Sequence, residues 1–161
     1  MSLLEIYLQD HHAAAVAGTR LARRAAANVS RKGMSGDLSD VAEEIADDLA
    51  ALEAIMRRLG TDPSRVKDAI TRGGELLGRL KLNGRLRERS PLSDVVELET
   101  LVVGITGKQA LWVSLRSAAV LPTEELDGLI ERAERQKRIV ESAREAAARH
   151  AFDLHGRSRE G

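Results

Sequence analysis

The sequence predicts an all-α protein, a four-helix bundle with a long crossover between its second and third helices. Four long stretches place apolar or small residues three and four positions apart, the spacing that builds one buried face on a helix. Segments that contain glycine or proline separate these stretches. The 161 residues include only three aromatic side chains and no run of the aromatic and β-branched residues that favour strands.

The composition excludes several classes of protein. Lys and Arg number 25, as do Asp and Glu, so the net charge is zero and predicts no general attraction to nucleic acid or anionic membranes. The absence of cysteine excludes disulfides, thiolate metal sites and cysteine nucleophiles. No apolar run is long enough to cross a bilayer, and residues 1–10 lack the basic residues of a secretory signal. We therefore expect a cytoplasmic protein that binds neither nucleic acid nor membrane.

The first helix is expected at residues 3–30, and the glycine-containing segment 31–36 ends it. Small residues dominate its middle, so a neighbouring helix can approach closely there. The expected inward stripe consists of Leu4, Leu8, His11, Ala15, Gly18, Ala22, Ala25 and Val29.

The second helix is expected to begin near Asp37 or Ser39, both favourable N-cap residues, and to end at Gly60. Its apolar residues repeat every seven positions, as in the seam of a bundle. A carboxylate interrupts that repeat, because Asp48 occupies a seam position. The seam comprises Leu38, Val41, Ala42, Ile45, Asp48, Leu49, Leu52, Ile55, Met56 and Leu59.

The crossover carries its own predicted helix, from Asp62-Pro63 to about Gly78, with proline at the first helical position. A basic segment follows as far as Ser90. Aromatic residues do not interleave its charges, unlike in surfaces that bind single-stranded nucleic acid. We therefore interpret it as a charged linker that lies over acidic helix faces.

The third helix is expected from Ser90-Pro91 to about Ala119, and the fourth begins with Thr123 as its N-cap. The bundle domain then spans residues 1–154, and residues 155–161 are expected to form a frayed tail. The expected seam of the third helix is Leu92, Val95, Glu99, Val102, Thr106, Gln109 and Val113. That of the fourth is Leu126, Leu129, Ala133, Gln136, Val140, Ala143 and Ala147.

The lengths of the connections predict the topology. Short links join the first helix to the second and the third to the fourth, so each of these pairs is expected to be antiparallel. The crossover has roughly 30 residues, enough to return along helices that rise about 1.5 Å per residue. We therefore expect the second and third helices to be parallel.

Two antiparallel pairs joined by a lengthwise crossover resemble the ferritin-like superfamily. The stretch 78–84, followed by Ser90-Pro91-Leu92-Ser93 and Glu97-Leu98-Glu99, is also similar to an uncharacterised family of small actinobacterial helical proteins. The resemblance covers nearly the whole chain. It implies a fold rather than an activity, because ferritin-like proteins include many without metal.

The topology invites a test for a di-metal site. Such bundles use two glutamates and two Glu-x-x-His motifs, and this sequence contains no Glu-x-x-His. The alternative is an atypical iron or manganese site whose oxygen ligands are Glu44, Asp48, Glu99 and Glu134. Folding each helix pair about its turn places Asp48 opposite Arg20 and Glu44 opposite Arg24, and places Glu99 level with Asp48. We therefore favour ion pairs of Asp48 and Glu99 with Arg20 or Arg24 over a metal site.

Other polar residues on the predicted seams are interpreted as structural. Gln109 and Gln136 are expected to form hydrogen bonds across the third and fourth helices. His11 lies on the inner stripe of the first helix, and the adjacent His12 points about 100° away, so the pair is poorly placed to chelate one ion.

These observations favour a non-enzymatic bundle, without catalytic or cofactor-binding residues, that acts through protein–protein contact or self-association. The alternative hypothesis is a ferritin-like oxidoreductase that uses iron or manganese bound by the four carboxylates.

Overall fold

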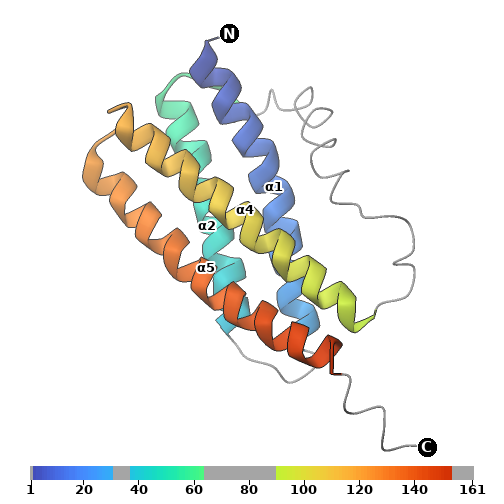
Figure 1. The fold of residues 1–161 in the computed structure, drawn as a ribbon. Helices are drawn as coiled ribbons and strands as arrows, with labels where there is room; N and C mark the ends of the chain where they lie inside the picture. Colours follow the sequence, from blue (N-terminus) through green and yellow to red (C-terminus); the bar gives the residue numbers. More distant parts are fainter. Residues whose placement is uncertain (1, 31–36, 64–89, 154–161) are drawn as a thin grey trace, which may run out of the picture.

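The computed structural model describes residues 2–30, 37–63 and 90–153, and four α-helices contain most of them (Figure 1). These residues contain no strand, which confirms the predicted all-α class. The shorter helix predicted to end near Gly78, the basic segment after it and the tail 155–161 lie outside the described residues. The helices are α1 (Leu3–Ser30), α2 (Asp37–Arg58), α4 (Pro91–Ser117) and α5 (Thr123–Ala151).

The helices form a bundle in which α1 packs on α2 and α4, and α5 packs on α4 and α2. Figure 1 shows that α2 and α4 run in the same direction, as predicted, while α1 and α5 run against them. Contacts between opposite ends agree with this. Tyr7 near the start of α1 donates a 3.2 Å hydrogen bond to Ser114 near the end of α4. Arg58 at the end of α2 donates one of 2.8 Å to Glu125 at the start of α5.

The apolar core has two clusters. One contains small side chains of α1, such as Ala22 and Ala25, packed with Leu98 and Leu101 of α4. The other contains the larger Trp112 of α4 and surrounds it with residues from all four helices. Along α2 and α4, polar residues separate the clusters, because Asp48 lies between Ile45 and Leu52, and Lys108 lies between Ile105 and Leu111.

The predicted seam of α4 is correct at Val95 but wrong by about one residue along most of the helix. Among the predicted positions, Leu92, Glu99 and Thr106 are exposed. One residue corresponds to a rotation of about 100° about the helix axis. The buried stripe carries bulkier apolar side chains, so this rotation removes more apolar surface from water. Its apolar members are Val95, Leu98, Leu101, Ile105, Leu111, Trp112 and Leu115.

The ends of the helices follow local sequence signals, with one difference from the prediction. Gly60 adopts a φ of +74°, a conformation that favours glycine, and Thr61 N–H donates to the Met56 carbonyl at 2.8 Å to close α2. Pro122, rather than Thr123, occupies the N-cap of α5. None of the helices in the described ranges has an apolar stretch long enough to cross a membrane.

Candidate functional site

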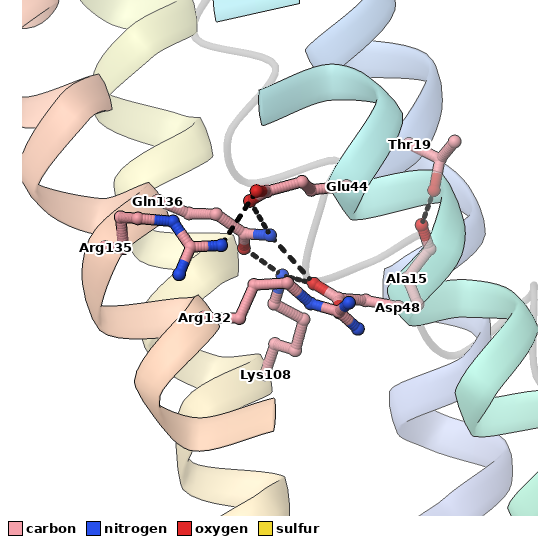
Figure 2. A network of polar contacts seen from close by, with 8 residues as sticks. All are labelled: Ala15, Thr19, Glu44, Asp48, Lys108, Arg132, Arg135 and Gln136. Carbon is pink, nitrogen blue, oxygen red and sulfur yellow. Dashed lines mark hydrogen bonds and ion pairs between the residues drawn. The ribbon is translucent and has the colours of Figure 1, made fainter. Parts of the chain in front are cut away.

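The most unusual feature of the interior is a buried carboxylate at the centre of the bundle (Figure 2). Asp48 falls on the inward stripe of α2, and its side chain is only 1% exposed. A buried charge is rare unless it is paired, because it loses the stabilisation of water. The groups around Asp48 therefore decide what the centre of the bundle can do.

Two cations contact Asp48 from different helices. Lys108 of α4 donates from Nζ to Oδ2, and Arg132 of α5 forms an ion pair with Oδ1. The Arg132 contact lacks the alignment of a hydrogen bond, since Oδ1 has no hydrogen-bond donor. Asp48 is thus held between one ammonium and one guanidinium.

Burial changes the electrostatics of Lys108. Desolvation lowers the pKa of its ammonium below the usual 10.5, and the adjacent Asp48 opposes this shift. Arg132 lowers the same pKa further, because it places a second positive charge nearby. The Lys108 side chain is 13% exposed, so solvent screens these interactions only weakly.

A neutral amide forms hydrogen bonds with three of these charged groups. Gln136 of α5 is fully buried and accepts a hydrogen bond from Lys108. Its Nε2 donates 3.1 Å hydrogen bonds to Asp48 and to Glu44. Arg135 completes the network through a 2.8 Å contact with Glu44 nearer the surface. The polar layer, by which we mean Glu44, Asp48, Lys108, Arg132, Arg135 and Gln136, therefore links α2, α4 and α5.

The remaining helix of the bundle, α1, contributes no charge to the polar layer. In Figure 2 the side chain of Thr19 on α1 turns back along its own helix. Its hydroxyl donates to the Ala15 carbonyl at 2.9 Å. The charge balance of the polar layer thus rests on two carboxylates and three cations from the other helices.

The predicted partners of Asp48 were wrong, although the prediction that it pairs with a cation is confirmed. Arg20 is exposed, and Arg24 pairs with Glu97 of α4 at 3.0 Å. Both arginines lie on a face of α1 that does not turn toward Asp48. Because α4 and α5 are rotated so that Lys108 and Arg132 point inward, these two residues supply the cations instead.

The structure brings together only part of the carboxylate set considered for metal. Glu44 and Asp48 share Gln136, whereas Glu134 accepts a 3.1 Å hydrogen bond from Gln109 on the surface. Glu99 is exposed and does not lie level with Asp48, because Asp48 meets α4 at Lys108, nine residues further along. Among the residues that the structure describes, no three His, Asp or Glu side chains are grouped to hold a metal ion.

The two glutamines form hydrogen bonds across helices, but not with each other. Gln109 of α4 donates to Glu134 of α5, and Gln136 of α5 accepts from Lys108 of α4. The prediction of cross-helix hydrogen bonds is confirmed, and the buried role belongs to Gln136 alone.

The inward histidine of α1 is His12 rather than His11. His12 is 6% exposed, and its Nε2 lies 3.0 Å from Glu53 of α2. His11 is half-buried and makes an edge contact with the Tyr7 ring, with 4.6 Å between the ring centroids. Desolvation lowers the pKa of His11.

Sequence reasoning missed Lys108 and Arg132, the two cations of the polar layer that contact Asp48. A signal for Lys108 was present, because it continues the stripe of Ile105, Trp112 and Leu115 at helical spacing. A lysine on such a stripe is easily assigned to the surface, since lysine is rarely buried unless it is paired.

Comparison with known protein families, curated proteins and solved structures finds no match.

Proposed function

We propose that this chain is a ferritin-like helical bundle that acts through contact with another protein surface, most directly by self-association, rather than through chemistry in its interior. The proposal is based on the outer face of α4. The interior supports it, because Lys108 and Arg132 already neutralise Asp48.

The outer face of α4 carries no charge along most of its length. Lys108 is the only charged residue from Thr100 to Leu115, and it points into the bundle. Leu92 and Val103 are 46% and 56% exposed. The residues of α4 that are exposed between Leu92 and Ser114 are Leu92, Glu99, Val103, Gly104, Thr106, Ala110 and Ser114, and among these only Glu99 carries a charge.

Two glycines on the solvent side of α4 are unexplained by packing within the described chain. A Cβ added to Gly104 or Gly107 would meet no atom within 4 Å. Glycine inside a helix costs about 1 kcal/mol relative to alanine. Close approach of another backbone is a reason to keep glycine, and an uncharged face allows a second α4 to approach without burying charges.

The proposal is tested by sedimentation velocity over a range of protein concentrations. We expect association that the exposed substitution Ala110→Glu on α4 abolishes, because it places a charge in the contact. The matched control is Ala50→Glu on the exposed face of α2, which should associate like the wild type. A chain that stays monomeric at every concentration, or two variants that behave alike, would contradict the proposal.

The alternative proposal, an oxidoreductase that binds iron or manganese, draws support from Glu44 and Asp48, which lie within reach of one amide. A metal ion there would have to replace the ammonium of Lys108. Elemental analysis after expression in medium supplemented with iron and manganese tests this. Stoichiometric metal that Asp48→Asn removes would favour the oxidoreductase.

A further inference from the structure

The outer face of α4 has a stripe whose smallest residues lie at its centre. Val103, Gly107, Ala110 and Ser114 follow one another at the spacing of a single helix face. Val103, Ala110 and Ser114 are exposed, and Gly107 is half-buried. Because glycine and alanine allow a neighbouring backbone to come near, the closest approach of a second helix is expected midway between Gly107 and Ala110.

The charge on this face lies away from that midpoint. Among the exposed residues of α4 between Leu92 and Ser114, only Glu99 is charged. It lies about 14 Å before the midpoint, because a helix rises about 1.5 Å per residue. A second copy of the chain therefore meets this charge at a place that depends on the direction in which its α4 runs.

A parallel pair of α4 helices would bring the two carboxylates of Glu99 to the same level. Packed helices lie about 8–10 Å apart, and like charges repel at such a distance. An antiparallel pair about the midpoint separates the two carboxylates by about 28 Å along the helices. This separation exceeds the screening length of about 8 Å at physiological ionic strength, so repulsion disfavours only the parallel pair.

The antiparallel pair also offers Glu99 an opposite charge. Arg116 lies about 11 Å after the midpoint, so it comes within about 3 Å of the level of Glu99 in a second, antiparallel copy. Both residues lie on the α5 side of α4, because Arg116 donates to Asp127 at 2.6 Å and Glu99 interacts electrostatically with Arg144.

A two-fold axis that makes the helices antiparallel places these α5 sides next to each other. The contact of Arg116 with Asp127 uses Nη1. A guanidinium has five N–H donors, so Arg116 can pair with a second carboxylate.

Building on the proposed self-association, we propose that the partner is a second copy of this chain whose α4 runs antiparallel, with a two-fold axis midway between Gly107 and Ala110. Gly107 of each copy packs on Ala110 of the other, and Glu99 pairs with Arg116. Both copies use the same surface, so the contact is closed and assembly stops at the dimer.

Disulfide cross-linking of the full chain tests the orientation, because the sequence contains no cysteine and an introduced thiol is unique. The variants are Val103→Cys and Ser114→Cys. The antiparallel pair places these two positions opposite each other, whereas the two copies of either position lie about 16 Å apart, too far for a disulfide. An equimolar mixture should therefore form a mixed disulfide dimer, identified by its intact mass, and each variant alone should not.

The substitution Glu99→Gln has opposite consequences for the two orientations. Loss of the pair with Arg116 should weaken the antiparallel dimer roughly two- to tenfold in sedimentation velocity. A parallel dimer would become tighter, because it loses a repulsion. Asp47→Asn on the exposed face of α2 is the matched control and should associate like the wild type.

The outcomes separate this proposal from self-association itself. Disulfide homodimers of a single variant, absence of the mixed disulfide dimer in a sample that associates, assemblies larger than a dimer or tighter association of Glu99→Gln would overturn the antiparallel dimer alone. A wild-type chain that stays monomeric at every concentration would overturn both proposals.

Discussion

The two faces of α4 differ in a way that reverses the usual distribution of charge on a helix. The inner face buries Trp112 and Leu98 but also carries Lys108, whereas the outer face from Thr100 to Ser114 is open to solvent and uncharged. Solvent exposure alone therefore does not determine where this helix places its charge. The carboxylate of Asp48 accounts for the inner lysine, and a second protein surface would account for the uncharged outer face.

The largest expected effect comes from removing the carboxylate that holds the inner charges. Asp48→Ala leaves the largely buried Lys108 and the partly buried Arg132 without their partner, and loss of one member of a buried ion pair costs about 3–5 kcal/mol. Urea denaturation should show this loss in the free energy of unfolding. The neighbouring, exposed Asp47→Ala is the control and should stay within about 0.5 kcal/mol of the wild type. Equal effects of the two substitutions would contradict the role of Asp48.

A smaller effect is expected from the pH dependence of stability. Because burial lowers the pKa of Lys108, the folded state releases this proton at a lower pH than the unfolded state does. Between the lowered pKa and 10.5 the unfolded chain binds more protons, so the contribution of Lys108 to stability rises with pH.

The control for this prediction is Lys108→Met, which lacks the titrating group. The free energy of unfolding of the wild type should therefore increase relative to that of Lys108→Met as the pH approaches 10.5. A difference that stays constant over this alkaline range would contradict the shifted pKa.

The smallest effect concerns the outer face. Gly107→Ala should stabilise the monomer by up to about 1 kcal/mol, because alanine is the better helix former and its Cβ meets open space. The same change should weaken self-association, since the added methyl groups keep two α4 helices apart. Gly60→Ala is the contrasting control, because its φ of +74° makes alanine destabilising. Unchanged association of the Gly107→Ala variant would show that Gly107 does not lie in the proposed contact.

The arrangement of the helices could be predicted from local signals. The bounds of α1, the start of α4 at Pro91 and the parallel direction of α2 and α4 follow from helical periodicity, capping residues and link lengths. These signals are patterns along the chain that do not depend on how the helices are rotated against one another, so a single sequence contains them.

The partners of Asp48 could not be predicted, for a geometric reason. Which residue meets Asp48 depends on the rotation of α4 and α5, and an error of one residue turns a helix by about 100°. The seam assigned to α4 placed Glu99 inside and left Lys108 unassigned. The seam of α5 was assigned correctly, since Ala133, Gln136 and Val140 are all buried.

The polar layer has a consequence for how the helices find their alignment. The inward residues of α2 repeat every seven positions, so sliding α2 by seven residues would replace one apolar side chain with another along most of its length. Only Asp48 breaks this repeat, and Gln136 and Lys108 meet it in one alignment. Any other alignment would leave an ionised group buried without a counter-charge. The charged residues at the centre thus select one alignment along the helix axes among several that hydrophobic contacts alone would permit.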